Sequence, residues 1–392
     1  MKKIIIISLC VLGIMVLVGF VLAFLSSQPL SKSDVINKIQ TTVEKSIGKN
    51  NVTGGMVFID SNEYKINQSF TAGNFVTQGT GENQPFHTAS VGKAFTATLI
   101  GCLIDDGMIN LDDKVVDYLG EDLLSGLFVF ENVDYRKEVT IRQLLNHTSG
   151  IADYFEDETN GTPPMKERVL DDKDKKWSPN DLLDFTRNYQ IAVSKPGETF
   201  HYSDTGYILL GLLIEEVSQM SFDEMLTTRI FEPLNMNDSY LMFYSEPKND
   251  PLPLADVWFE GVNIKNYSSL SIDWAGGGIC STAKDLAIFI RALNNGEIIR
   301  NETLQSLYQF DHKFINGIQY GNGFMEYHFA EFFPTLSSIP NYIGHMGVLG
   351  TQMFYNKQTD TVYISSFGSI DYTTGSVQTM INILSILHRI QE

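Results

Sequence analysis

Cysteine is scarce in this chain, with only three among 392 residues. Cys10 lies in an apolar N-terminal run, so only Cys102 and Cys280 belong to the rest of the chain. Two cysteines are too few for a disulfide framework, and their spacing matches no zinc-binding pattern. The seven histidines include no His-Glu-x-x-His pair, so we predict no metal site and no cofactor. We expect two buried thiols, with one disulfide between them as the alternative.

Positive charge is also in short supply. Lysine and arginine number 28 against 47 aspartates and glutamates, which gives a formal net charge of -19. An acidic surface repels phosphate backbones, so the composition argues against nucleic acid as a partner, and its simplest consequence is solubility. Apolar residues make up 43% of the chain, enough for a sizeable core. Composition leaves the oligomeric state open.

Long apolar runs are absent except at the N-terminus. Two lysines precede an uncharged stretch from Ile4 to Leu25, which is long enough to span a bilayer as a helix. The lysines are expected to stay inside. We therefore predict that residues 1–27 anchor the protein at the cell membrane by a single span, with residues 28–392 outside. The alternative is a signal peptide cleaved near Val21-Leu22-Ala23, followed by secretion.

Predicted strands lie at both ends of the region after the anchor. Met56–Ile59 is a short apolar run followed by a turn, which is typical of a buried strand. Met353–Tyr355 and Val362–Phe367 resemble adjacent strands, before a final helix from about Gly375 to His388. We predict one domain over residues 28–392, with strands in about 33–80 and 275–392 and a helical part over about 90–270.

Helix starts are marked by side chains that can cap free backbone N–H groups. The strongest helix candidate covers Ala89–Asp106 and ends at Gly107. By contrast, Lys166–Lys176 is rich in charge and has no apolar pattern, so we predict a solvated loop there. Further capped starts are predicted at Ser178 with Asp181, Ser221 with Glu224, and Thr282 with Asp285.

Ser90 and Lys93 form a Ser-x-x-Lys pair at the start of the predicted helix over residues 89–106. Side chains three residues apart on a helix share a face, so the two functional groups can meet. The helix N-terminus favours a developing anion, and a lysine among apolar neighbours can lose its proton and activate the serine. The pair predicts a nucleophile with its base, although a capping serine followed by a surface lysine gives the same pattern.

The second chemical element is Tyr202-Ser203-Asp204, which precedes an apolar run from Gly206 to Val217. A tyrosine oxygen held near a lysine can share its proton-transfer role. Asp204 could orient the lysine or bind a substrate amide. It could equally be a helix N-cap, which is a common role for aspartate.

The third element is His345-Met346-Gly347, just before the predicted C-terminal strands. Gly347 allows a substrate backbone to approach a strand edge closely. The next residue, Val348, could offer its backbone N–H to an oxyanion together with the N–H of Ser90. Taken alone this element is weak, because a lone histidine is usually structural.

Together, and in this order, the three elements resemble the serine β-lactamase and penicillin-binding-protein superfamily. The resemblance is to the branch of class C β-lactamases, D,D-peptidases and related esterases, and it covers roughly residues 33–390. It implies an α/β fold, a β-lactamase-like sandwich in which helices flank an antiparallel sheet and a helical subdomain is inserted. The segments that carry it are Ala89–Lys93, Leu144–Gly150, Tyr202–Tyr207 and Gly276–Thr282.

The resemblance also implies roles for single residues. Ser90, Lys93 and Tyr202 would be catalytic, and Asp204, His345, Gly347 and Val348 would bind the substrate. Two positions depart from the pattern: this branch usually has asparagine in place of Asp204 and often has Lys-Thr-Gly in place of His345-Met346-Gly347. The first departure weakens the expectation of amide or β-lactam recognition, and the second makes a dedicated β-lactamase less favoured.

The expected chemistry is acyl transfer through an acyl-enzyme on Ser90. We expect an extracytoplasmic serine hydrolase with D,D-peptidase-like or esterase activity on cell-envelope D-alanyl groups or related esters. Its partner would be a small molecule or a cell-envelope peptide or ester. A true β-lactamase is one alternative. A non-catalytic penicillin-binding or sensing module is another, although the joint presence of Ser90, Lys93 and Tyr202 argues against it.

Overall fold

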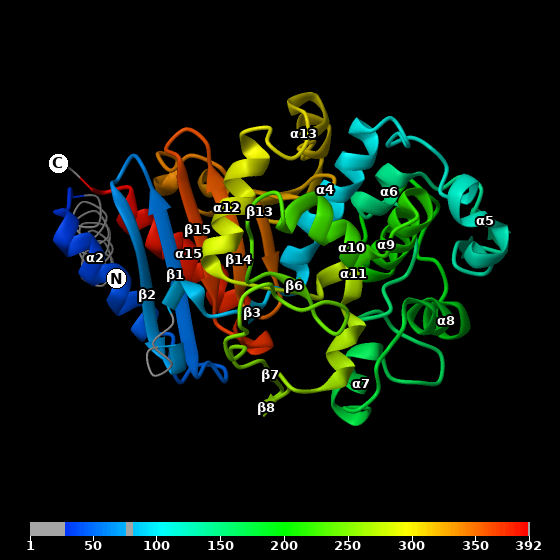
Figure 1. Cartoon of the computed structure of the whole chain (residues 1–392), viewed down its shortest axis with the longest axis horizontal. Coiled ribbons are helices and arrows are strands. Elements are labelled where there is room, and N and C mark those ends of the chain that lie inside the picture. Colours follow the sequence, from blue (N-terminus) through cyan, green and yellow to red (C-terminus); the bar gives the residue numbers. More distant parts are fainter. Residues whose placement is uncertain (1–27, 76–80, 391–392) are drawn as a thin grey trace, which may run out of the picture.

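One large antiparallel sheet brings the two ends of the chain together (Figure 1). The computed structural model describes residues 28–75 and 81–390. β1 (Gly54–Ser61) and β2 (Ile66–Gly73) join six C-terminal strands in the order β10-β11-β12-β13-β14-β15-β1-β2. With helices on this sheet and a helical part beside it, the predicted α/β fold class is confirmed. The C-terminal strands are β10 (His312–Ile315), β11 (Ile318–Tyr320), β12 (Met325–Tyr327), β13 (Tyr342–Gly347), β14 (Thr351–Asn356) and β15 (Thr361–Ser366).

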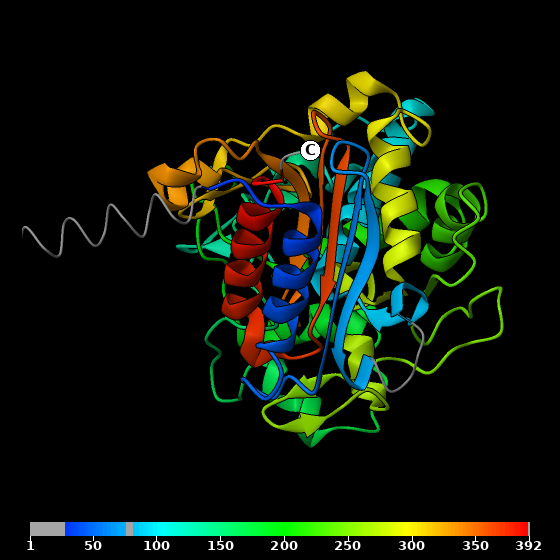
Figure 2. The same cartoon turned by 90° about the vertical axis from the view of Figure 1, so that its left-hand side faces the viewer.

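Both faces of this sheet are covered. β14 and β15 are buried along their whole length, and successive side chains of a strand point to opposite faces. α2 (Lys32–Glu44) and α15 (Thr373–Leu387) pack on the face that carries Val57, while α12 (Ala283–Asn294) covers the face that carries Met56. Figure 2 shows α2 and α15 side by side on one face and α12 on the other.

The helical part lies beside the sheet, on the right of Figure 1. α4 (Gly92–Asp105) is buried continuously from Gly92 to Leu103, which explains why its sequence is apolar on all sides. α9 (Asp204–Ser218) packs directly against it. The other helices are α5 (Val116–Leu124), α6 (Ile141–Leu145), α7 (Met165–Asp171), α8 (Pro179–Tyr189), α10 (Phe222–Leu226), α11 (Trp274–Gly277), α13 (Asn301–Leu307) and α14 (Phe329–Phe332).

Short elements complete the fold. β3 (Phe86–His87), β9 (Ile279–Ser281) and β6 (Tyr240–Leu241) form a three-stranded sheet in the order β3-β9-β6. Two hairpins pair β4 (Val129–Phe130) with β5 (Val133–Asp134) and β7 (Trp258–Phe259) with β8 (Val262–Asn263). The single-turn helices are η1 (Gly81–Asn83), η2 (Ala89–Val91), η3 (Thr227–Phe231), η4 (Ser268–Ile272), η5 (Pro334–Leu336) and η6 (Ile370–Tyr372).

The predicted helix caps are present. Ser178 and Ser221 each accept a hydrogen bond from the backbone N–H three residues on, and the carboxylates of Asp181 and Glu224 accept one from the backbone N–H of the capping residue. Thr282 caps α12 by accepting from the N–H of Asp285. These local signals were sufficient because each bond joins residues only three positions apart.

One predicted loop is wrong. Part of the charged stretch from Lys166 to Lys176 belongs to α7, which covers Met165–Asp171. Met165 and Val169, four residues apart, share the buried face of this helix, and charged residues occupy most of the other positions. A single apolar pair is too short a pattern to stand out among so many charges.

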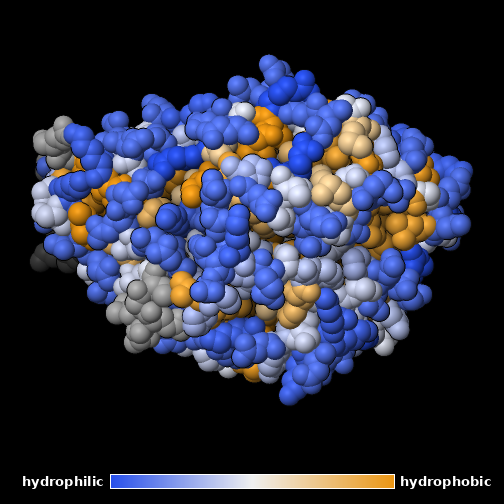
Figure 3. Space-filling model, viewed as in Figure 1, coloured by the Kyte–Doolittle hydropathy of each residue, from blue (hydrophilic) through white to orange (hydrophobic). Residues whose placement is uncertain are grey.

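The prediction of two buried thiols is confirmed, because Cys102 and Cys280 are both buried and unpaired with each other. Hydrophilic residues cover most of the face in Figure 3, with apolar groups between them, in keeping with an acidic composition.

The predicted membrane location must be corrected. No helix within residues 28–75 and 81–390 is long and apolar enough to cross a membrane. The apolar run from Ile4 to Leu25, on which the prediction of a single span rested, lies outside the described residues. A location at the cell membrane is therefore withdrawn.

Candidate active site

Ser90 lies in a tightly held turn between β3 and α4. Ala89, the residue before it, has a φ of 48°, a left-handed conformation that costs a non-glycine residue of order 1–3 kcal/mol. Its N–H donates to Nδ1 of His87 over 3.2 Å. On the other side, the hydroxyl of Thr351 donates to the carbonyl of Thr88 over 2.8 Å. The surrounding structure thus holds Ala89, and with it the turn that carries Ser90, in a conformation that a non-glycine residue rarely adopts.

Glycines allow three segments to meet at this turn. A Cβ at Gly277 would lie 2.8 Å from the carbonyl oxygen of Ala89, and one at Gly92 would lie 2.9 Å from Cα of Gly277. A Cβ at Gly347, at the end of β13, would lie 2.7 Å from the carbonyl oxygen of Thr88. Any side chain at these positions would push the strand or α11 away from Ser90.

Lys93 is fully buried one turn after Ser90. Its ammonium has three N–H donors, and the structure provides three acceptors: Ser90 Oγ at 3.2 Å, the carbonyl of Gly276 at 2.8 Å and the carboxylate of Asp204. Burial alone would lower the pKa of Lys93, but Asp204 and Tyr202 outweigh it and raise this pKa. The geometry therefore favours a protonated Lys93, rather than the deprotonated base expected from its apolar neighbours.

Tyr202 completes the group around the nucleophile. Nζ of Lys93 lies 5.0 Å from the centre of its ring, and Ser90 and Lys93 both lie close enough to lower the pKa of its hydroxyl. Burial raises the pKa of Tyr202 to about 12, against the lowering effect of Lys93, while Asp204 raises it further. The phenol is therefore neutral at rest, and Asp204 opposes its ionisation.

Asp204 does not cap α9. The N-cap is Ser203, whose side chain makes no capping bond, and Asp204 is the first helical residue. Its carboxylate reaches Lys93 instead. Of the alternatives for Asp204, the structure excludes the cap and shows the contact with the lysine.

His345 is fully buried and belongs to a chain of hydrogen bonds beneath the site. Its Nδ1 lies 2.7 Å from the carbonyl of Met346, and its Nε2 lies 3.1 Å from the hydroxyl of Tyr320. Tyr320 in turn contacts Nε2 of His147 at 3.0 Å, and Nδ1 of His147 accepts from the N–H of Ser203 at 3.1 Å. The chain therefore links the segment of Tyr202 to strand β13.

The two ends of this series of hydrogen bonds fix the direction in which each bond is donated. The N–H of Ser203 can only donate and the carbonyl of Met346 can only accept, so both histidines are neutral single tautomers. His147 donates from Nε2 to Tyr320, Tyr320 donates to Nε2 of His345, and His345 donates from Nδ1 to Met346. Burial lowers the pKa of His147, and it lowers that of His345 to about 3, in agreement with neutral rings.

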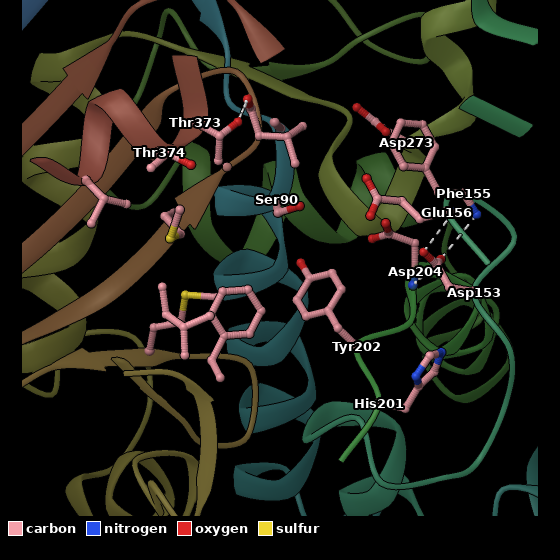
Figure 4. A pocket seen from close by; sticks show the side chains of 18 of the residues that line it. Ser90, Asp153, Phe155, Glu156, His201, Tyr202, Asp204, Asp273, Thr373 and Thr374 are labelled. Carbon is pink, nitrogen blue, oxygen red and sulfur yellow. Dashed lines mark hydrogen bonds between the residues drawn. The ribbon is translucent and has the colours of Figure 1, made fainter. Parts of the chain in front are cut away.

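A cavity of about 470 Å³ opens above Ser90 (Figure 4). Of the residues expected from the sequence, Ser90, Tyr202, Asp204, Gly347 and Val348 line it, whereas Lys93 lies beneath Ser90. His345 is not among the lining residues. The cavity is lined by Ala89, Ser90, Asp153, Phe155, Glu156, Asp157, His201, Tyr202, Asp204, Asp273, Phe314, Ile315, Met325, Met346, Gly347, Val348, Thr373, Thr374 and Val377.

The sequence analysis missed several of these residues. Asp153 and Glu156 follow the Leu144–Gly150 segment, and Asp273 precedes Gly276–Thr282, so proximity to the resembling segments was the one available signal. Thr373 and Thr374 begin α15, and no signal in the sequence pointed to them. Within the described residues, no three His, Cys, Asp or Glu side chains are grouped as metal ligands.

Comparison with known proteins places this site in a family. The family model described as Beta-lactamase matches residues 43–366. The chain belongs to the beta-lactamase family. It is 30% identical over 188 residues to penicillin-binding protein 4 of Amycolatopsis lactamdurans, a match that covers 47% of this chain and 42% of that protein. Across the first curated relatives, the chain spans only 30–42% of their length.

Solved structures share the fold. A D-stereospecific amidohydrolase from Streptomyces sp. superposes with a TM-score of 0.69 at 24% identity, covering 87% of this chain and 96% of that one. The D-amino acid amidase of Ochrobactrum anthropi SV3, complexed with D-phenylalanine, gives a TM-score of 0.70 at 21% identity, with coverage of 91% and 99%. The resemblance inferred from the motifs is confirmed: this is a member of a hydrolase family with the β-lactamase fold.

Proposed function

We propose that the protein is a serine hydrolase that works through an acyl-enzyme on Ser90, with D,D-peptidase-like or esterase activity on cell-envelope D-alanyl groups or related esters. One observation carries the proposal: Nζ of the buried Lys93 lies 3.2 Å from Ser90 Oγ at the floor of the cavity, with Tyr202 beside both. The D-stereospecific amidohydrolase and the D-amino acid amidase that share the fold support the D-acyl part of it.

The reaction begins with attack of Ser90 Oγ on the carbonyl carbon of the ester or amide. Tyr202, in its ionised form, accepts the serine proton, and the Lys93 ammonium stabilises that phenolate. The N–H groups of Ser90 and Val348 hold the oxyanion. Because burial and Asp204 keep the pKa of Tyr202 near 12, acylation is expected to accelerate as the pH rises above neutrality.

Breakdown of the tetrahedral intermediate completes acylation. The C–O or C–N bond breaks, the departing alcohol or amine takes the proton from Tyr202, and Ser90 remains acylated. Water then attacks the acyl carbon, gives its proton to Tyr202, and releases the carboxylic acid as Ser90 regains a proton. The same groups therefore serve both halves of the cycle.

The test is covalent labelling read by intact mass. A fluorophosphonate should add one equivalent to the wild type and none to Ser90→Ala. Ser149→Ala is the matched control, because Ser149 is buried outside the cavity, and it should label like the wild type. Full labelling of the Ser90→Ala protein would overturn the assignment. A labelled penicillin that stays bound on Ser90, together with no turnover of any ester or amide, would instead favour the penicillin-binding or sensing module.

A further inference from the structure

Charge is distributed unevenly around the cavity. Five carboxylates line it, those of Asp153, Glu156, Asp157, Asp204 and Asp273, and no lysine or arginine does among the residues that the structure describes. In Figure 4 the carboxylates of Asp153, Glu156, Asp204 and Asp273 gather on one side of Ser90 and Tyr202. The cavity thus offers a substrate negative charge on one side.

Three of these carboxylates already have protein partners. Asp204 binds Lys93, and Asp157 lies 2.7 Å from Nε2 of His201. Asp153 is buried and accepts from three backbone N–H groups, those of Asp204, Phe155 and Glu156. These groups hold the walls of the cavity and need no ligand.

Asp273 and Glu156 differ from them. Within the described part of the chain, neither carboxylate accepts a hydrogen bond, and neither is paired with a lysine or an arginine. The neighbour of Asp273 is Nε2 of His87, at 3.6 Å. Since Nδ1 of His87 accepts from the N–H of Ala89, and burial lowers the pKa of His87 to about 4, this histidine is neutral. Nε2 of His87 is itself buried without a hydrogen-bond partner among the described residues.

Asp273 therefore faces the cavity with its charge uncompensated. Burial and the nearby Asp204 raise the pKa of Asp273 to about 7, although Lys93 acts in the opposite direction. A cation placed in the cavity would stabilise the ionised carboxylate. Glu156, at the exposed edge, would add to the attraction.

The opposite side of the cavity is apolar. Its lining includes Phe314, Met325, Met346 and Val377, which come from the sheet and from α15. Ser90 lies between this side and the carboxylates (Figure 4). The site can therefore hold a molecule that is cationic at one end and apolar or uncharged at the other.

We propose that the substrate is an aminoacyl ester or amide with a free ammonium group and no carboxylate, whose ammonium lies against Asp273 and Glu156. This rests on the proposed acyl transfer at Ser90 and narrows its substrate class. A D-alanyl ester with a free amine has this chemistry. Penicillins and peptides that end in D-alanine carry a carboxylate close to the scissile bond, which Asp273 and Glu156 would repel and no lining lysine or arginine would bind.

The test compares three esters at neutral pH: D-alanine methyl ester, which is cationic, N-acetyl-D-alanine methyl ester, which is neutral, and N-succinyl-D-alanine methyl ester, which is anionic. The wild type should favour them in that order, with a kcat/KM for the cationic ester about 10- to 100-fold above that for the neutral one, as charge-assisted hydrogen bonds provide. Equal values or the reverse order would overturn the proposal.

Variants assign the preference to residues. Asp273→Asn and Glu156→Gln should each reduce the cationic-to-neutral ratio, by roughly 10-fold and 3-fold, since each keeps the shape and removes the charge. Glu232→Gln, an exposed carboxylate outside the cavity lining, should keep the wild-type ratio. A ratio unchanged in both cavity variants would also count against the proposal. Because Glu156 is exposed, its variant remains informative if Asp273→Asn does not fold.

Labelling separates this proposal from the one on which it rests. If the fluorophosphonate does not label Ser90 in the wild type, the acyl-transfer proposal has failed. If Ser90 is labelled but no ester is turned over, the esters are tested as competitors of labelling. Protection by the cationic ester alone supports the ammonium site, and equal or absent protection rejects it.

Discussion

The two walls of the cavity present different chemical groups to Ser90. The sheet-side wall, which includes Met346, Gly347 and Val348, approaches Ser90 through backbone and apolar groups. The helical wall, which includes Asp204 and Asp273, approaches it through carboxylates. The sheet-side wall is therefore sensitive to volume and the helical wall to charge. Substitutions that change only one of these properties can tell the two contributions apart.

The largest effect is expected from the two groups next to Ser90. Lys93→Ala and Tyr202→Phe should each slow acylation by about 10³-fold, because one removes the charge that stabilises the phenolate and the other removes the phenolate itself. If they act as one unit, the double variant should lose little more than either single one. Acylation rates measured by intact mass test this, with Ser90→Ala as the baseline. Losses that multiply in the double variant would show independent roles.

Added side-chain volume should disrupt the sheet-side wall. Gly347→Ala should slow acylation by about 10- to 100-fold and destabilise the fold by about 1–3 kcal/mol, because its Cβ would lie 2.7 Å from the carbonyl oxygen of Thr88. Gly206→Ala is the control: its Cβ would meet the nearest atom, the carbonyl oxygen of Leu144, at 3.5 Å, an ordinary contact. Labelling rates and thermal unfolding would separate the two. Equal behaviour would mean that the Ser90 turn tolerates displacement of β13.

The sequence predicted what depends on local spacing. Ser90 and Lys93 meet because they are three residues apart on a helix, and the caps at Ser178 and Ser221 also join residues three apart. The resemblance added the order of the segments and hence the fold. Tyr202 and Gly347 reach Ser90 only through that fold, so their placement followed from the resemblance and not from periodicity.

What the sequence could not predict depends on contacts between distant segments. His345 has its place because Tyr320 lies beneath it, 25 residues away in the chain. Asp273 and Glu156 are two among 47 acidic residues, and nothing local separates a cavity carboxylate from a surface one. The helix α7 was missed because one apolar pair carries its buried face.

The charge of the helical wall can be changed without a change in its shape. Asp204→Asn removes the carboxylate that raises the pKa of both Lys93 and Tyr202, so both pKa values should fall. More Tyr202 is then ionised at neutral pH, and labelling of Ser90 by the uncharged fluorophosphonate should become roughly 3- to 10-fold faster there, with its pH profile displaced to lower pH. Asp106→Asn, which removes a carboxylate paired with Arg229 outside the cavity, should leave the profile in place. A displacement to higher pH would mean that Lys93 needs Asp204 for catalysis.

The smallest effect is expected where the two walls are joined beneath the cavity. The chain from Ser203 through His147, Tyr320 and His345 to Met346 connects the segment of Tyr202 to the strand that ends at Gly347. Tyr320→Phe would leave Nε2–H of His147 without an acceptor and Nε2 of His345 without a donor. Because both rings are buried, this should lower the free energy of unfolding by about 1–3 kcal/mol and slow acylation only a few-fold.

Tyr308→Phe is the matched control, because the Tyr308 hydroxyl makes one long hydrogen bond of 3.4 Å to Asn294 and lies outside the cavity lining. It should cost less than about 1 kcal/mol and leave acylation unchanged. Denaturant unfolding of the two variants, together with their labelling rates, measures both quantities. If Tyr320→Phe costs no more than Tyr308→Phe, the walls are positioned separately, each by its own packing. If it destabilises the fold and also slows acylation, the buried chain positions the phenol of Tyr202 relative to β13, and the role of His345 is to transmit position and not to bind substrate.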